Sequence, residues 1–124
     1  MQKEELESAL NSGLMAQTIF TIKKRSIFEK IRENGQFLKG DNINLQILDD
    51  QYLNNTIGIG YTATKRIGNA VKRNKAKRIM RELAKKIIRK DKTNIYYVLI
   101  AKPSLLDTSF EELIKELRSR INEK

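Results

Sequence analysis

The sequence predicts a single α+β domain in which a helix, two or three strands, a basic helix, a further strand and a closing helix follow one another. Its 124 residues suit one domain and are too few for two ordinary ones. Hydrophobic residues make up 40% of the chain, which is enough for a modest core. Apolar residues alternate with a period of two in some segments and recur every three to four residues in others, which indicates both strands and amphipathic helices.

The first helix is predicted between two local signals. Ser26 followed by Glu29 has the pattern of a capping box, and Asn34-Gly35 is typical of a helix end. The apolar residues between these signals are Ile27, Phe28 and Ile31.

Two strands are predicted next. Ile43, Leu45 and Ile47 alternate with polar residues, and Asp49-Asp50 opens a turn. The second strand runs from Ile57 to Ala63, where bulky residues alternate with Gly58, Gly60 and threonines. That strand therefore has one nearly bare face, which leaves room for another group to lie close to the sheet. Phe37-Leu38 is a candidate for a third, short strand.

The end of the chain predicts one more strand and one more helix. The continuous β-branched and aromatic run from Ile95 to Ala101 indicates a buried strand that ends before Pro103. Thr108 with Glu111 has the pattern of a second capping box. The helix after it has a regular apolar face, consisting of Phe110, Leu113, Ile114, Leu117 and Ile121.

The charge of the chain is concentrated in one segment. The formal net charge is +10. Residues 65–90 contain twelve basic residues and a single acid, Glu82, a net charge of +11, so the remaining thirteen basic and fourteen acidic residues nearly cancel. A concentration of one sign on a fifth of the molecule is typical of a surface that binds a polyanion.

The same segment has the periodicity of a helix, with Asn69 as its predicted N-cap. The stripe predicted to be buried consists of Ala76, Ile79, Met80, Leu83 and Ile87. The residues predicted to share the opposite face are Asn74, Arg78, Arg81, Lys85 and Arg89. Like charges at this spacing destabilise an isolated helix by about a few tenths of a kcal/mol per pair, so the pattern suggests a bound anion that offsets the repulsion.

Composition excludes several kinds of chemistry. The chain contains no cysteine and no histidine, which excludes disulfides, thiolate metal sites, cysteine nucleophiles and serine–histidine arrangements. No apolar run approaches the ~20 residues needed to span a bilayer. Residues 1–17 form a polar, acidic extension unlike a secretory signal or a basic transit peptide. We therefore expect a soluble cytoplasmic protein, with residues 18–124 as its folded domain.

The segment from Lys65 to Glu82 resembles the signature of the bacterial ribonuclease P protein subunit. The residues in register with the family pattern are Arg73, Asn74, Lys77, Arg78, Arg81 and Glu82. Arg66 and Lys75 depart from it, each exchanging lysine and arginine, and Lys75 lacks the bidentate phosphate fork of an arginine. The resemblance covers roughly residues 19–121 and includes the Phe28 helix, Gly60-Tyr61-Thr62 and Lys102-Pro103.

This resemblance implies a fold and a function. Family members are the small protein partner of a catalytic RNA that removes the 5′ leader from precursor tRNA. The RNA performs the hydrolysis with magnesium that it mainly holds itself, so no catalytic or metal-binding residue is expected in the protein. The implied fold is a two-layer α-β-β-β-α-β-α domain similar to the fourth domain of elongation factor G. It has a left-handed β-α-β crossover around the basic helix, whereas the general rule favours a right-handed one. We expect a monomer outside the holoenzyme.

The charge pattern and the resemblance together predict the residues that contact RNA. They are Lys65, Arg66, Lys72, Arg73, Asn74, Lys75, Lys77, Arg78, Arg81 and Lys85. Arg73 and Lys77 lie at the flanks of the helix face, so an alternative is that their stems pack along the strands. Asn74 has the alternative role of bracing the helix start.

Phe28 matches a family position that lines a cleft for the single-stranded leader of precursor tRNA. The alternative, equally weighted, is core packing with Ile27 and Ile31. The neighbouring family aromatic is replaced by Arg32 in this chain. Tyr61 alternates with Ile57 and Ile59, which favours a place in the core.

Two other functions fit parts of the pattern. A ribosome-associated structural RNA-binding protein would share the basic helix, but it requires neither the Arg-Asn-x-x-Lys-Arg spacing nor the Phe28 helix. A peripheral membrane protein would lie on anionic lipid through the basic helix and would need large apolar residues free to insert. In this chain the apolar residues of that helix are instead matched by other amphipathic elements that need covering.

Overall fold

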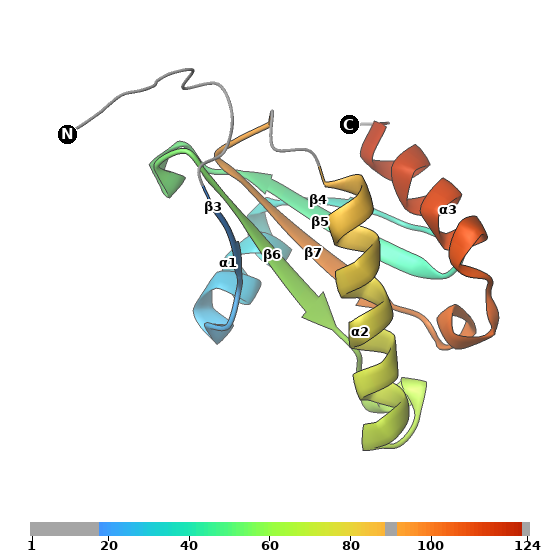
Figure 1. Ribbon diagram of the computed structural model, residues 1–124. Coiled ribbons are helices and arrows are strands. Elements are labelled where there is room, and N and C mark those ends of the chain that lie inside the picture. Colours follow the sequence, from blue (N-terminus) through green and yellow to red (C-terminus); the bar gives the residue numbers. More distant parts are fainter. Residues whose placement is uncertain (1–17, 89–91, 123–124) are drawn as a thin grey trace.

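The computed structural model describes residues 18–88 and 92–122. They form a mixed sheet covered by helices (Figure 1). The strands are β3 (Thr18–Thr21), β4 (Gln36–Leu38), β5 (Ile43–Asp49), β6 (Thr56–Thr62) and β7 (Ile95–Ala101). The helices are α1 (Arg25–Asn34), α2 (Ala70–Ile87) and α3 (Phe110–Asn122), and short 3₁₀ turns lie at Gln51–Leu53, Lys65–Ile67 and Pro103–Asp107. The predicted extension, residues 1–17, lies outside the described residues.

The sheet has the strand order β3-β6-β7-β5-β4. β6 lies between β3 and β7 and is parallel to both. β5 is antiparallel to β7, and β4 is antiparallel to β5. The predicted strands, including the short one at Phe37-Leu38, are therefore confirmed.

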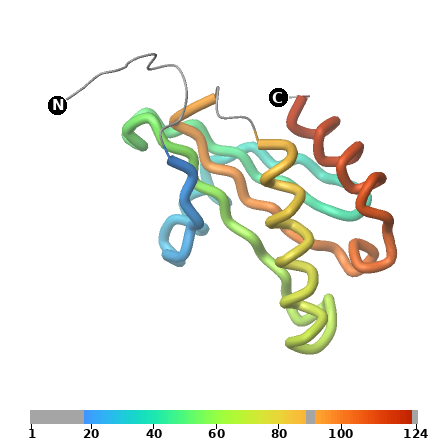
Figure 2. The backbone as a smooth tube through the Cα atoms, in the orientation of Figure 1, coloured from blue at the N-terminus to red at the C-terminus, as the bar shows by residue number. Residues whose placement is uncertain are grey.

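The crossover from β6 through α2 to β7 is left-handed. In Figure 1 both strands run from upper left to lower right, α2 lies in front of the sheet, and β7 lies to the right of β6. With a helix facing the viewer and the strands pointing down, a right-handed connection would place the second strand on the left. The tube in Figure 2 follows the same path from green through yellow to orange. The handedness implied by the resemblance is thus confirmed against the general rule.

The helices lie on both faces of the sheet, so the prediction of two layers is wrong. α2 and α3 cover one face, where their apolar residues form a cluster with Leu45, Ile57 and Leu99. α1 covers the other face, where Ile31 is buried in a second cluster with Val98. β7 is therefore buried on both sides, which explains why its sequence is continuously apolar rather than alternating.

β3 was not predicted. It has only four residues, Thr18 to Thr21, and it pairs with β6 alone at the edge of the sheet. A segment of this length contains too few residues to establish a period of two. It extends the predicted element order at its N-terminal end to β-α-β-β-β-α-β-α.

Both predicted capping boxes are wrong, although both helices exist. α1 starts two residues earlier than expected, because its N-cap is Lys24 rather than Ser26, and Lys24 makes no side-chain cap hydrogen bond. The side chain that caps the N-terminus of α3 is that of Ser109, whose Oγ accepts a hydrogen bond from the Glu112 backbone N–H at 3.2 Å. The Thr108 hydroxyl instead donates to the Ser104 carbonyl at 2.8 Å. At α3, Thr108 with Glu111 and Ser109 with Glu112 both have the capping-box spacing, so the sequence alone does not decide which hydroxyl caps the helix.

Candidate nucleic-acid interface

The basic helix begins where the sequence predicts. The Asn69 side chain accepts a hydrogen bond from the Lys72 backbone N–H at 3.0 Å, which satisfies one of the free donors of the first turn. Gly68, just before it, has a φ of 140°, a conformation that favours glycine. The guanidinium of Arg73 donates to the Gly68 carbonyl at 2.8 Å and thereby ties the helix to the preceding turn. The direction of α2 is therefore fixed locally.

α2 has one buried and one charged face. The buried residues are Ala76, Met80, Leu83, Ala84 and Ile87, so all of the predicted stripe is buried except Ile79, which is half-buried. The exposed cations of the predicted set are here called the basic stripe: Lys65, Arg66, Lys72, Lys75, Arg78, Arg81 and Lys85. Asn74 lies exposed among them. No helix in the described part of the chain is long and apolar enough to cross a membrane.

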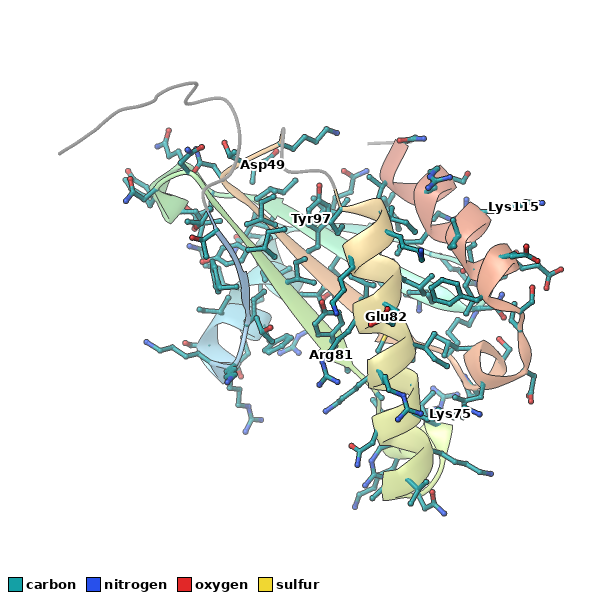
Figure 3. The ribbon with its side chains drawn as sticks, in the orientation of Figure 1. Asp49, Lys75, Arg81, Glu82, Tyr97 and Lys115 are labelled. Atoms are coloured by element: carbon teal, nitrogen blue, oxygen red, sulfur yellow. The ribbon has the colours of Figure 1, made fainter. Side chains whose placement is uncertain are left out.

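The basic stripe is little neutralised by the protein's own carboxylates. Within residues 18–88 and 92–122, the ion pair that involves the stripe joins Lys85 to Glu82, with 3.4 Å between Nζ and Oε2. Both side chains are more than half exposed, so this pair contributes little stability. Figure 3 shows Lys75 and Arg81 along α2, with Glu82 beside them and Lys115 apart on α3. The stripe therefore remains an open cationic surface.

Two of the predicted RNA contacts, Arg73 and Lys77, are half-buried rather than exposed. Arg73 is half-buried through its bond to Gly68, so the alternative of a structural role holds for its guanidinium. Lys77 is also half-buried, and it lines a groove on the α1 side of the sheet rather than the outer surface of α2.

Tyr61 links the basic stripe to the sheet. Its ring packs against the main cluster and is half-buried, which partly confirms its predicted place in the core. The guanidinium carbon of Arg81 lies 5.7 Å from the ring centroid, a cation–π contact. Burial raises the pKa of the Tyr61 hydroxyl, and the positive charge of Arg81 opposes that shift. Tyr61 therefore holds the arginine at the sheet edge, a role that the alternating pattern did not indicate.

A groove of about 370 Å³ lies between α1 and the sheet. Phe28 and Arg32 of α1 form one side. The other lining residues come from the sheet and from α2: Gln46, Tyr61, Thr62, Ala63, Lys77, Val98 and Ile100. An apolar floor with cations at the rim suits a ligand that has flat apolar rings and negative charges.

Phe28 both packs against a hydrophobic cluster under α1 and lines the groove, so the structure does not make it a core residue alone. Its ring lies directly over Gly60: a Cβ atom added there would be 2.5 Å from Phe28 Cε1. On the bare strand face predicted from Gly58 and Gly60, Gly60 is thus the position that lets α1 approach, whereas the Tyr96 and Phe20 rings lie over Gly58.

Comparison with known proteins identifies the family. A family model described as Ribonuclease P matches residues 17–123. The chain belongs to the ribonuclease P protein family. The ribonuclease P protein component of Gluconacetobacter diazotrophicus is 34% identical over 107 residues, covering 84% of this chain and 90% of the relative. That of Bartonella quintana is 35% identical over 112 residues, covering 83% and 81%.

Solved ribonuclease P proteins share the fold. The Staphylococcus aureus protein matches with a TM-score of 0.69 and 24% identity, over 82% of this chain and 92% of that one. The Thermotoga maritima protein matches with a TM-score of 0.70 and 18% identity, over 84% and 96%. The family model, over residues 17–123, spans all of the described elements.

Proposed function

We propose that this chain is the protein component of ribonuclease P, an endoribonuclease that removes the 5′ leader of precursor tRNA. The basic stripe binds phosphates of the catalytic RNA, and the groove beside Phe28 binds the single-stranded leader. The observation that carries this proposal is the open row of cations along α2, next to an apolar groove whose rim carries Arg32 and Lys77.

The stripe has the properties of a phosphate-binding surface. Six of the ten predicted contact residues are exposed cations or amides on one helix, and Lys65 and Arg66 extend them from the preceding turn. Cations spaced along a helix neutralise successive phosphates and release counterions, which makes binding strong and salt-dependent. Because phosphates carry no sequence information, these contacts position the protein on a folded RNA rather than select a sequence.

The chemistry of leader removal is assigned to the RNA. Among the described residues, no three metal-ligating side chains come together, and the chain has no histidine or cysteine. The protein's contribution is to bind substrate and RNA together.

The groove suits a single strand better than a duplex. Its volume of about 370 Å³ and its position between α1 and the sheet admit individual bases but not a paired helix. Stacking of one base on an aromatic side chain contributes about 1–3 kcal/mol. Phe28 is the aromatic residue from α1 in this groove, with Tyr61 at its far wall.

Reconstitution tests the proposal. The full-length protein, added to a bacterial ribonuclease P RNA at low magnesium, should restore cleavage of precursor tRNA at the mature 5′ end. Phe28→Leu keeps the apolar volume under α1 but removes the ring, so it should lower the preference for precursor over mature tRNA while the melting temperature changes little. If the wild-type protein changes neither the cleavage rate nor the substrate affinity of the RNA, the proposed function is wrong.

A further inference from the structure

Phe37 is an aromatic side chain that the core does not use. It lies in the middle of β4, the edge strand of the sheet, and 53% of its surface is exposed. It belongs to neither of the two hydrophobic clusters, although its neighbour Leu38 packs against the larger one. Because residues alternate between the two faces of a strand, Phe37 must lie on the opposite face from Leu38, the face that α1 covers.

The pairing of the strands places Phe37 in line with the groove. Gly60 pairs with Val98, Val98 pairs with Gln46, and Gln46 pairs with Phe37. These four residues form one row across the sheet, on the α1 face. Val98 and Gln46 are part of the groove lining, and Phe28 lies over Gly60 at the other end of the row. Directly paired residues have Cβ atoms about 5 Å apart, so Phe37 borders the groove beyond Gln46.

We propose that Phe37 is a stacking site for a nucleobase of single-stranded RNA, at the β4 end of the groove. This inference rests on the proposed function and extends it, because it adds a second aromatic contact for the strand that Phe28 binds. The row spans three strand spacings, about 14 Å between Gly60 and Phe37. Stacked nucleotides advance by about 3.4 Å each, so the two rings contact bases that are not adjacent and lie at most about four steps apart.

The charges around the row suit an RNA strand that follows this path. Arg32 of α1 lines the groove and is exposed. Lys39 follows β4 directly and is also exposed. A strand crossing from Phe28 to Phe37 would therefore have Arg32 beside the groove and Lys39 just after β4 as cations that can neutralise its phosphates.

The experiment measures how the effect of a Phe37 substitution depends on leader length. Precursor tRNAs with leaders of one to ten nucleotides are bound to the reconstituted holoenzyme, with wild-type protein, Phe37→Ala or Phe37→Leu. With long leaders, either substitution should weaken binding by about fivefold or more, the lower end of the range for a stacked base. With the shortest leaders it should have no effect. The length at which the loss begins should differ from the corresponding length for Phe28→Leu by up to about four nucleotides.

Tyr52 provides a matched control. It is the other strongly exposed aromatic residue of the described part, at 86%, and it lies on the turn after β5, away from the groove. Tyr52→Ala should leave the affinity unchanged at every leader length. Phe37→Trp adds a direct readout, because stacking on a base should quench its fluorescence when a long leader binds.

The possible outcomes separate this inference from the proposed function. If Phe28→Leu shows a leader-dependent loss but the Phe37 variants behave like wild type at all lengths, the stacking site does not exist, whereas the proposed function stands. A Phe37→Ala loss that is equal for all leaders and for mature tRNA would also overturn the stacking site. If the wild-type protein itself has no effect on the RNA, the proposed function fails first.

Discussion

Replacing Arg78 with alanine tests whether the basic stripe binds RNA phosphates. Arg78 is exposed in the middle of α2. Its side chain makes no hydrogen bond or ion pair with another described residue, so its removal leaves no buried group unsatisfied. Its loss should therefore affect RNA binding and leave the free energy of unfolding almost unchanged.

The size of the effect follows from counterion release. Each phosphate contact contributes about 0.7 to 0.9 to the slope of log affinity against log salt. If all seven cations of the stripe contact phosphates, the wild-type slope reaches about −6, and Arg78→Ala lowers its magnitude by about 0.9. Because this contact's share of the affinity varies as the salt concentration to the power of about −0.9, relative to 1 M salt, its removal lowers the affinity by about 15-fold at 50 mM salt. The loss shrinks to about fivefold at 150 mM salt.

The assay is a titration of the ribonuclease P RNA with protein at four or five salt concentrations. Lys115→Ala is the matched control, because it removes the same charge from an exposed position on α3, apart from α2 (Figure 3). The control should reproduce the wild-type slope. If Arg78→Ala keeps the wild-type slope, or if Lys115→Ala changes it equally, the stripe acts only through net charge and the assignment of phosphate contacts is wrong.

Two further predictions concern the structure around the groove. Gly60→Ala should lower the free energy of unfolding by about 1–3 kcal/mol, because the new Cβ would lie 2.5 Å from the Phe28 ring; thermal melts should show that Phe28→Leu in the same chain restores part of the loss. Asp50→Asn should lower the melting temperature at pH 7 but progressively less as the pH falls below about 4. The hydrogen bond from Lys30, 2.8 Å long, lowers the pKa of Asp50, so its stabilisation is present above the unfolded pKa and is lost as pH falls through the folded one. An equal difference in melting temperature at pH 7 and pH 2 would contradict this account.

The parts of the fold that the sequence predicted are those with long, regular patterns. α2 combines an N-cap at Asn69, five apolar residues at helical spacing and a charged face, so three independent signals agree. β5 and β6 alternate over seven residues each, and their boundaries differ from the prediction by at most two residues. The family motif lies on this same helix, which explains why the RNA-binding surface was predictable.

The parts that escaped prediction depend on tertiary contacts or on very short segments. The face on which α1 packs is set by Gly60 and Gly35, where close backbone approach excludes a side chain: a Cβ on Gly35 would lie 2.7 Å from the Ile47 carbonyl oxygen. The glycines of β6 predicted that another group approaches the sheet closely, but their pattern did not identify that group as α1. The contact between Arg81 and Tyr61 depends on how α2 packs against β6. The row that ends at Phe37 requires the strand register, which single-strand patterns do not contain.

The balance of energies on α2 explains how the protein can keep so many like charges on one face. Repulsion between exposed cations costs about a few tenths of a kcal/mol per neighbouring pair. Burial of a large apolar side chain such as Met80 or Leu83, each fully buried here, contributes about 1.5–3 kcal/mol. A few such residues therefore outweigh the repulsion along the stripe, and the helix folds on the sheet without a bound anion. RNA is then not needed to form α2, and the free energy of neutralising the stripe is available for binding.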